Sequence, residues 1–500
     1  MTNKLRDPLP PISPDIAPWH WRSQPLSHRT GSEVFAALFL SSAAAAIATL
    51  LESPATPGQP QLARYSICAG PPRQIQGQAQ LWMPAVGEIL PLLQRLSDRR
   101  PAPSTAPTDL PFTGGWLGWL GYDLAREIEQ LPDPQPDSLP FPVAYWYEPD
   151  CFAVLDHVEQ QLWLAATQPH QLDDLQQRLC ASLPTPSLAP VAISAIGLAP
   201  QFHTSQAHYE AAILQVQQHI QAGDIFQANL SLRFEVPTAA SSWAIYQALQ
   251  HINPSPFASY WASPWGAVIS CSPERLVQLQ QQQAQTRPIA GTRPRGRTPE
   301  HDRQLATELL INPKERAEHI MLVDLERNDL GRVCNWGSVS VDELLVVERY
   351  SHVMHLVSNI SGHLRDRHNA IDLIRAVFPG GTITGCPKVR CMEIIAALEP
   401  LSRNLFYGSC GYLDQRGHLD LNILIRTLLY VPQLTAHSEK VAPLSPPKLK
   451  TQNSKLPAIV YGQVGAGIVA DSDPQGEWLE ALQKAQAQLV ALQLGATFES

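Results

Sequence analysis

Residues 312–329 read NPKERAEHIMLVDLERND, and this stretch predicts the helix on which the fold and the functional site depend. Asn312 is a suitable N-cap, and Pro313 suits the first helical position because its missing N–H would have no partner there. The apolar residues that follow are expected to carry the helix to about Asn328.

Two glutamates mark one face of this predicted helix. Glu315 and Glu318 stand three residues apart, so they are neighbours on the helix surface. Leu322 and Leu325 continue the same face, which makes it otherwise apolar. Two like charges on a half-buried face predict a cation close by.

A second pair, Glu477 and Glu480, opens the predicted C-terminal helix, with Lys484 four residues beyond the second glutamate. The apolar stripe of this helix is predicted to consist of Trp478, Leu482, Ala485, Leu489 and Leu492. One interpretation is a solvated face with a Glu480–Lys484 ion pair. The other is a site for a hard divalent ion, because such ions prefer several carboxylate oxygens. The residues alone leave both open.

The bulk properties describe an ordinary water-exposed globular protein. A chain of 500 residues is long for one core, and its formal charge of −9 comes without a basic stripe. We therefore expect no nucleic-acid partner. The eight cysteines form no Cys-x-x-Cys pair, which indicates reduced thiols and a cytoplasmic location.

The chain is not expected to enter a membrane. Residues 34–51 are rich in Ala and Ser and run into Glu52, which predicts a buried helix rather than a membrane span. The N-terminal residues lack the pattern of a secretory signal.

The distribution of proline and polar residues predicts the organisation of the chain. The expected segments are an extended N-terminal stretch over 1–30, an α+β lobe over 31–183, a connector over 184–200 and a second lobe over 201–495. Within the second lobe, residues 432–457 are predicted to be a disordered insertion between two strands, 421–430 and 458–461.

Several motifs occur together along the chain. They are PIAGT at 288–292, EHIMLVDLERND at 318–329, FPGGTITGCPKVR at 378–390 and GAGIVADS at 465–472. In this order they resemble the chorismate-utilising family, which includes anthranilate synthase component I, aminodeoxychorismate synthase component I and the isochorismate and salicylate synthases. The resemblance implies an α/β fold of two packed, mainly antiparallel sheets with helices outside.

The resemblance also implies a binding site for magnesium and chorismate. Magnesium would be held against the C1 carboxylate of chorismate by Glu315, Glu318, Glu477 and Glu480. Backbone amides at Gly291, Thr292, Gly465 and Gly467 would contact the substrate. Arg426 would bind the other carboxylate, and Lys484 would make a further contact with a substrate anion.

Proton transfer is assigned by resemblance to His355, with Thr382 and the glutamate cluster, Glu315 included, as candidates for the acid at the C4 oxygen. Zinc ligation by His352 and His355 is not expected. Residues 345–360 alternate as a strand, which would direct the two rings to opposite faces.

The nucleophile is predicted from Gln227, which stands where isochorismate-type relatives carry a water-activating lysine. A neutral amide cannot act as a general base, so ammonia is the expected nucleophile. No Gly-x-Cys-x-Gly elbow with a downstream His-x-Glu is present. The expected source of ammonia is therefore a separate glutamine amidotransferase subunit.

Two products are compatible with these motifs. Asn229, Thr384 and Phe406 resemble the aminodeoxychorismate branch, which leads to 4-aminobenzoate and folate. Ala290 is the anthranilate pattern, which leads to tryptophan, and it excludes a covalent lysine at that place. The expected product is 4-amino-4-deoxychorismate, with anthranilate plus pyruvate as the alternative. A regulatory protein that only binds chorismate or tryptophan is a third hypothesis, against which the complete glutamate set argues.

Three short segments resemble the tryptophan pocket of anthranilate synthases. The residues concerned are Glu52, Ser53, Tyr65, Ser66, Asn253, Pro254, Ser255 and Pro256. The alternative is that these are ordinary strand-end and turn residues, since Asn-Pro and Ser-Pro commonly start turns.

Overall fold

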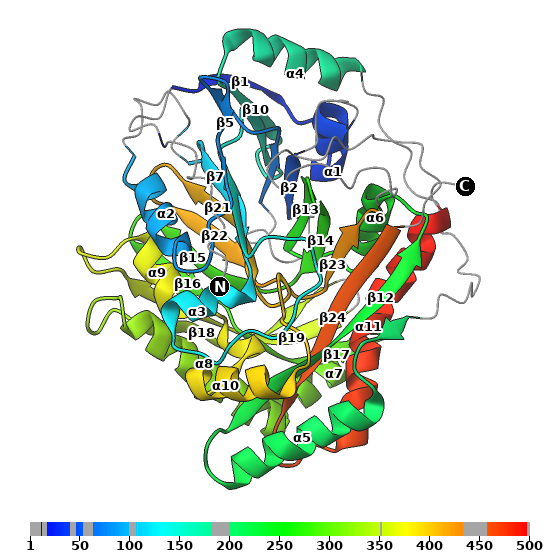
Figure 1. The fold of residues 1–500 in the computed structure, drawn as a ribbon. Helices are drawn as coiled ribbons and strands as arrows, with labels where there is room; N and C mark the ends of the chain where they lie inside the picture. Colours follow the sequence, from blue (N-terminus) through cyan, green and yellow to red (C-terminus); the bar gives the residue numbers. More distant parts are fainter. Residues whose placement is uncertain are drawn as a thin grey trace, which may run out of the picture.

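The computed structural model describes residues 12, 18–40, 47–53, 64–99, 107, 109–181, 200–350, 353–433 and 458–497. Two large sheets dominate the molecule, and helices cover their outer sides (Figure 1). The strands pair in antiparallel fashion, as in β12 (Gln227–Thr238) with β24 (Ala458–Ile468) and β13 (Phe257–Ser263) with β2 (Ala48–Glu52). The expected fold of two antiparallel sheets with surrounding helices is confirmed.

The first sheet has twelve strands. Its order is β1 (His20–Pro25), β10 (Gln161–Ala166), β9 (Cys151–Asp156), β3 (Tyr65–Ala69), β2, β13, β14 (Gly266–Ser272), β23 (Thr427–Val431), β24, β12 and β11 (Gln201–Phe202), with β20 (Gly385–Cys386) beside β12. The second sheet has ten. Its order is β17 (Ile289–Pro294), β19 (Val353–His363), β16 (Gln283–Thr286), β15 (Arg275–Gln280), β22 (Leu419–Asn422), β21 (Ser409–Asp414), β7 (Gly115–Leu120), β8 (Ala144–Tyr147) and β6 (Leu81–Trp82), with β18 (Ser340–Arg349) paired to β19.

Both sheets draw strands from both predicted lobes. In the first sheet, β2 from the N-terminal part pairs with β13, with Glu52 opposite Ala258. In the second sheet, β7 pairs with β21 in the same way. Edge strands leave backbone groups unpaired, and these junctions satisfy them across the two halves. The two predicted lobes therefore share both sheets. Residues 184–199 of the predicted connector lie outside the described residues.

Aromatic side chains fill the space between the sheets. Trp119 of β7 packs against Tyr145 of β8 with ring centroids 4.4 Å apart, and Trp261 of β13 reaches it from the other sheet at 5.9 Å. Gly118 allows β7 and β8 to approach this closely, because a Cβ there would lie 2.2 Å from the Tyr145 carbonyl oxygen. This core fixes the two sheets relative to each other.

Helices carry the predicted glutamate pairs on the outside of the sheets. The helix α8 (Pro313–Gly331) packs against β17 and β19, and α11 (Pro474–Thr497) packs against β24 and the helices α5 (Gln206–Gln221) and α6 (Ser242–Ile252) (Figure 1). The predicted start of α8 is confirmed, because the Asn312 side chain accepts hydrogen bonds from two amides of its first turn. No helix within the described ranges is both long and apolar enough to span a bilayer.

The single helix predicted over 34–51 is wrong. The helix α1 (Gly31–Phe35) continues only as a short π-helical segment to Leu40, and β2 begins at Ala48. Residues 48–52 are nearly all buried, and their β-branched and leucine side chains pack on both faces of the sheet. Within the predicted N-terminal extension, His20–Pro25 form β1 and pair with β10.

Two long strands predicted from alternation are each divided in the structure. Residues 345–360 contribute to β18 and β19, which pair in antiparallel fashion, and His352 lies outside the described residues. Residues 421–430 contribute to β22 in the second sheet and β23 in the first, so the chain changes sheets over 423–426. Local alternation cannot reveal such a crossing. Residues 434–457 of the predicted insertion lie outside the described residues, while β23 and β24 on its two sides pair with each other.

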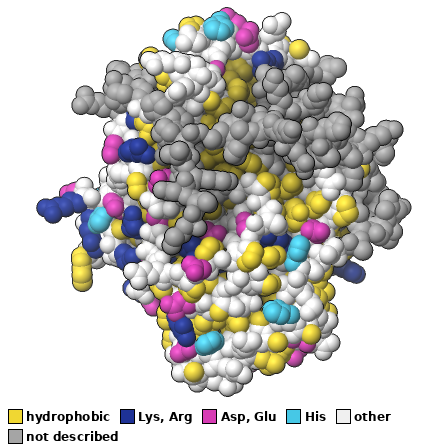
Figure 2. All heavy atoms as spheres, in the orientation of Figure 1, with side chains coloured by type: hydrophobic (Ala, Val, Ile, Leu, Met, Phe, Trp, Pro, Cys, Tyr) yellow, Lys and Arg dark blue, Asp and Glu magenta, His cyan; other side chains and the backbone are white. Residues whose placement is uncertain are grey.

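Charged side chains are spread over the surface. On the face shown in Figure 2, acidic and basic side chains are interspersed with apolar ones around the lower half of the molecule.

Arg403 is the most deeply buried arginine among the described residues, with 2% of its surface exposed. Its guanidinium binds both oxygens of Glu399 and lies between the rings of Tyr122 and Tyr407. It also donates to the carbonyls of Ile383 and Asn229, which joins η3 (Gly381–Ile383) to β12.

We expect Arg403→Met to lower the free energy of unfolding by about 3–5 kcal/mol, because Glu399 would stay buried without a partner. Urea denaturation monitored by tryptophan fluorescence measures this change. Arg327→Met is the matched control, since Arg327 and Asp324 form a solvent-exposed pair on α8 that is worth about 1 kcal/mol or less. Equal losses in the two variants would contradict the assigned role of Arg403.

Candidate active site

The first glutamate pair lies near the start of α8, where each carboxylate has a protein partner. Arg293 of β17 donates to Glu315 Oε1 from Nη1 at 3.0 Å. Gln227 of β12 donates to Glu318 Oε1 from Nε2 at 3.1 Å. The pair is thus engaged by one cation and one amide from two different strands.

In the second pair, at the start of α11, one glutamate likewise has a neutral hydrogen-bond partner and the other a cationic one. The Ser472 hydroxyl donates to Glu477 Oε1 at 2.6 Å, and Lys484 Nζ lies 2.8 Å from Glu480 Oε1. Glu477 is buried, whereas Glu480 is exposed. The Glu480–Lys484 pair expected from spacing is therefore present.

Both pairs lie near the glycines of β24, since a Cβ at Gly467 would lie 3.6 Å from Glu318 Oε1 and Lys484, the partner of Glu480, donates to the Gly465 carbonyl. Burial raises the pKa of Glu318, and the charge of Glu315 adds to this shift. Burial likewise raises the pKa of Glu477, with Glu480 as the neighbouring like charge. Lys314 and Lys484 oppose both shifts, so the same two lysines act on both helices.

These four carboxylates fit a hard divalent cation by their chemistry. All are oxygen donors, and Glu477 is buried and Glu318 half-buried, each beside a second negative charge, a situation that a cation relieves. Within the described residues, no three His, Cys, Asp or Glu side chains are close enough together to hold one ion. In this structure Arg293 and Lys484 neutralise Glu315 and Glu480, whereas Glu318 and Glu477 have neutral hydrogen-bond partners.

Glycines leave room beside the glutamates. Gly291 of β17 has φ of +70°, and a Cβ there would lie 2.7 Å from Glu315 Oε2. A Cβ at Gly467 of β24 would lie 2.4 Å from Gln227 Nε2. A Cβ at Gly465 would meet Asn229 Oδ1 at 3.1 Å, and the Gly465 carbonyl accepts from Lys484. A side chain at any of the three would fill the space beside these polar groups.

Several buried polar atoms at this place have no hydrogen-bond partner among the described residues, and three of them lie on β12 and β19. They are Gln227 Oε1, Asn229 Oδ1 and His355 Nε2. Buried polar groups are nearly always hydrogen-bonded, so these atoms are suited to contact a polar ligand. They belong to β12 and β19, which ties the two sheets to one site.

His355 is neutral in this structure. Its Nδ1 lies 2.9 Å from the Thr292 hydroxyl, and burial lowers its pKa to about 3, with the charge of Arg426 adding to the shift. A neutral ring with a free Nε2 suits hydrogen bonding to a ligand better than donation of a proton from an imidazolium.

Arg426 stands where the chain crosses from one sheet to the other, with φ of +50°. Its Nη1 donates to Asn253 Oδ1 at 3.0 Å, and burial lowers its pKa. Arg426 also acts on the pKa of His355, so the two predicted substrate contacts share one site.

Glu274 was missed in the sequence. It follows β14 and is buried, and burial raises its pKa to about 7. The Thr382 hydroxyl, the Ile289 amide and Arg426 oppose this shift, in that order, which places Glu274 beside two predicted site residues. The sequence does carry a signal for Glu274. It is a single glutamate between two apolar strands, within Ser-Pro-Glu-Arg at 272–275.

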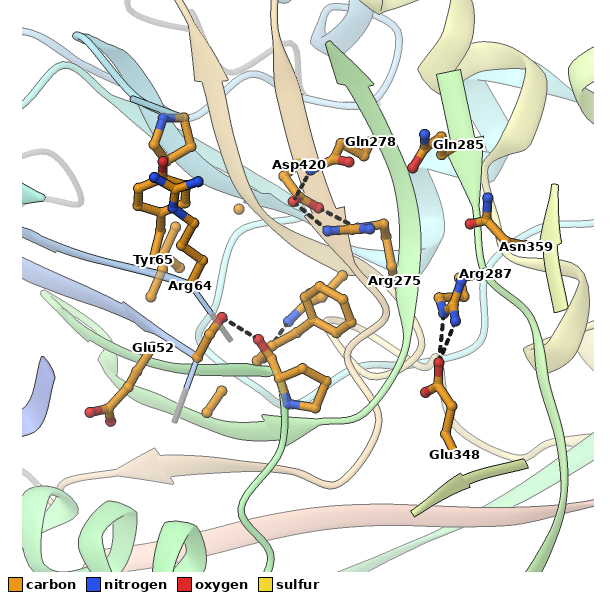
Figure 3. Close-up of a pocket in the computed structure, with 18 of the residues that line it drawn as sticks. Glu52, Arg64, Tyr65, Arg275, Gln278, Gln285, Arg287, Glu348, Asn359 and Asp420 are labelled. Atoms are coloured by element: carbon orange, nitrogen blue, oxygen red, sulfur yellow. Dashed lines mark hydrogen bonds and ion pairs between the residues drawn. The ribbon is translucent and has the colours of Figure 1, made fainter. Parts of the chain in front are cut away.

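Only some of the residues predicted to form a tryptophan pocket line a common cavity. A cavity of about 1090 Å³ between the sheets is lined by Glu52, Ser53, Tyr65 and Pro256, together with Arg275 and Arg287 and the carboxylates they bind (Figure 3). Ser66, Asn253, Pro254 and Ser255 are not among its lining residues. Ser66 bonds His157, and Asn253 bonds Arg426.

The Glu52 carboxylate is turned away from this cavity (Figure 3). It accepts hydrogen bonds from Ser32, Tyr246 and Gln250, and burial raises its pKa. In this structure Glu52 therefore ties α1 to α6 through its carboxylate.

Known proteins are similar to this chain over most of its length. A family model described as chorismate binding enzyme matches residues 48–490. An anthranilate synthase component I-like protein of Synechocystis sp. is 55% identical and covers 96% of this chain and 93% of its own. Aminodeoxychorismate synthase component 1 of Bacillus subtilis is 42% identical, covering 77% of this chain and 78% of its own.

The crystal structure of anthranilate synthase component I from Streptococcus pneumoniae is also similar. It aligns with a TM-score of 0.69 and 31% identity, over 85% of this chain and 92% of its own. The family model covers far more than half of the residues, and these relatives match along most of their length. The chain therefore belongs to the family of chorismate-binding enzymes.

Proposed function

We propose that this enzyme adds ammonia to chorismate in the presence of magnesium and forms 4-amino-4-deoxychorismate. The observation that carries the proposal is that the glutamate pairs of α8 and α11 both lie near the glycines of β24. A Cβ at Gly467 would lie 3.6 Å from Glu318 Oε1, and Lys484, the partner of Glu480, donates to the Gly465 carbonyl. The charge of Arg426 acts on His355 at the same site. Chorismate is a dicarboxylate, and this arrangement offers it one carboxylate-bound metal and one guanidinium.

Glu315, Glu318, Glu477 and Glu480 would hold the ion, which supplies positive charge for the C1 carboxylate and so orients the ring. Arg426 would bind the enolpyruvyl carboxylate. The amides of Gly291, Thr292, Gly465 and Gly467 would contact the substrate, and the three glycines support this role because they carry no side chain that blocks an approach. Lys484 is available for a further anionic oxygen once it leaves Glu480.

Ammonia would attack ring carbon C2 while the C4 hydroxyl departs as water, which requires one proton at the leaving oxygen. Glu274 suits this step, since its pKa of about 7 keeps it partly protonated at neutral pH. Thr382 lies beside it and can orient the leaving oxygen. His355 would hydrogen-bond the ring through Nε2.

Gln227 favours ammonia over water as the nucleophile. Its amide binds Glu318 and has no basic lone pair with which to deprotonate water. We infer that the ammonia comes from a glutamine amidotransferase subunit, since relatives of this chain are named as component I of their synthases.

The fate of the aminated ring decides between two products. Return of the amine to C4 gives aminodeoxychorismate, which Asn229, Thr384 and Phe406 favour by resemblance. Expulsion of pyruvate gives anthranilate, which Ala290 favours. Ala290 is buried in β17 and offers no nucleophile, so ammonia must attack the ring directly on either route.

Tryptophan is the ligand that we propose for the cavity lined by Glu52, Ser53, Tyr65 and Pro256. The Glu52 carboxylate would have to leave Ser32 and Tyr246 before it could bind the ammonium group of an amino acid. Any such binding is therefore coupled to the position of α1.

The product is tested with purified protein, chorismate, magnesium and a high concentration of ammonium. We expect a non-fluorescent aminated species that yields 4-aminobenzoate after addition of a lyase. Stoichiometric pyruvate together with blue-fluorescent anthranilate, and no 4-aminobenzoate after the lyase, would establish the alternative.

The metal site is tested by Glu318→Gln, which keeps the shape of the side chain and removes its charge. We expect at least about a hundredfold loss of amination rate, because the ion and its carboxylates orient the substrate. Chorismate consumption across a magnesium titration measures this loss. The control Glu300→Gln, in a solvent-exposed pair on α7 (Pro299–Ile311), should retain the rate of the original protein. Normal magnesium dependence in Glu318→Gln would rule out the proposed site.

The acid is tested through the pH dependence of kcat/KM. A group with a pKa of about 7 is protonated below that pH, so activity should fall as the pH rises through 7. Glu274→Gln cannot donate the proton and should lower kcat/KM by about 10²–10⁴-fold and abolish this descending limb. An unchanged pH profile in Glu274→Gln would show that the proton comes from elsewhere.

A further inference from the structure

Arg293 occupies a position that the proposed metal site would need. It follows Thr292 in β17, and its Nη1 lies 3.0 Å from Glu315 Oε1 while also donating to the Thr292 carbonyl at 2.9 Å. Glu315 Oε2 faces Gly291, whose hydrogen leaves space for it. Both oxygens of this carboxylate are thus beside one short stretch of β17.

The same guanidinium has a second acidic partner. Its Nε lies 3.1 Å from Glu308 Oε1 on α7. The Glu308 side chain is 58% exposed, whereas those of Arg293 and Glu315 are 19% and 21% exposed. One arginine therefore bridges a half-buried carboxylate in the site and a solvated one outside it.

A divalent ion and a guanidinium cannot share one carboxylate oxygen without repulsion. At distances of 3–4 Å this repulsion disfavours the simultaneous presence of both cations, even with strong screening. Removal of a counter-ion from a half-buried charge is costly, but Arg293 keeps Glu308 when it leaves Glu315. The second partner makes the exchange of arginine for metal feasible.

We propose that Arg293 is the resident counter-ion of the metal site: it neutralises Glu315 while the ion is absent and is held by Glu308 alone when the ion binds. This inference rests on the proposed magnesium site. Arg293 is thus a positioning residue that sets the affinity for the ion. Glu308, which lies outside the site, influences this affinity through its contact with Arg293.

The inference is tested by calorimetric titration of the protein with magnesium chloride alone, without chorismate. We expect Arg293→Gln to bind magnesium about three- to tenfold more tightly, because no protein cation competes for Glu315. Glu308→Gln should bind magnesium about two- to fivefold more weakly. Of the two carboxylates that Arg293 contacts, only Glu315 then remains, so Arg293 competes more strongly with the ion. Arg303→Gln, which removes a solvent-exposed arginine on α7, is the matched control and should leave the affinity unchanged.

The magnesium affinity is expected to rise in Arg293→Gln and to fall in Glu308→Gln. A loss of folding would lower the affinity in both variants, so it cannot produce this result. Weaker or unchanged binding in Arg293→Gln, with folding confirmed by circular dichroism, would overturn the inference while leaving the metal site intact. If the original protein binds magnesium and Glu318→Gln does not, the proposed site stands whatever Arg293 does. If the original protein itself binds no magnesium, both the site and the role of Arg293 fall together.

Discussion

Burial of like charges is the constraint around which the site is built. Glu477 is buried and Glu318 half-buried, each beside a second glutamate, and each therefore depends on a nearby partner to remain in place. Gln227 from β12 binds Glu318 and Ser472 before α11 binds Glu477, while Arg293 from β17 and Lys484 of α11 bind the neighbouring Glu315 and Glu480. The position of two helices is thereby tied to strands of both sheets.

The packing of the two sheets makes this convergence possible. β12 and β24 belong to the first sheet, whereas β17 and β19 belong to the second. The chain passes between the sheets over residues 423–426, and Arg426 stands at this crossing. A substrate anion bound by Arg426 would therefore contact the junction of the sheets, where the backbone is already fixed by pairing on both sides.

A second buried ion pair supports the same region from behind. Arg403 and Glu399 connect the η3 turn that carries Thr382 with the β12 backbone at Asn229. Their contribution differs in kind from that of the glutamates near the substrate. Arg403 makes four hydrogen bonds to protein groups, so it rigidifies the site, whereas His355 and Gln227 keep free polar atoms that a ligand can satisfy.

The sequence by itself determined the elements whose signals are local. The Asn312 cap and the i, i+3 glutamates predicted α8 and its acidic face, because both depend on contacts within one helical turn. The ordered motifs led to the family and to the two-sheet fold. By contrast, the division of residues 345–360 and 421–430 between separate strands depends on which neighbours satisfy the backbone, and no local pattern encodes that.

Only the tertiary structure decided which side chains meet. Glu274, Thr382 and Arg426 are far apart in the chain, and burial among them gives Glu274 a pKa near 7, a value that its sequence position does not imply. The same holds for Glu315, whose partner Arg293 comes from a strand 22 residues earlier. The sequence determined which chemical groups are available, and long-range packing decided which of them share one low-dielectric site, because desolvation and ion pairing depend on distance in space.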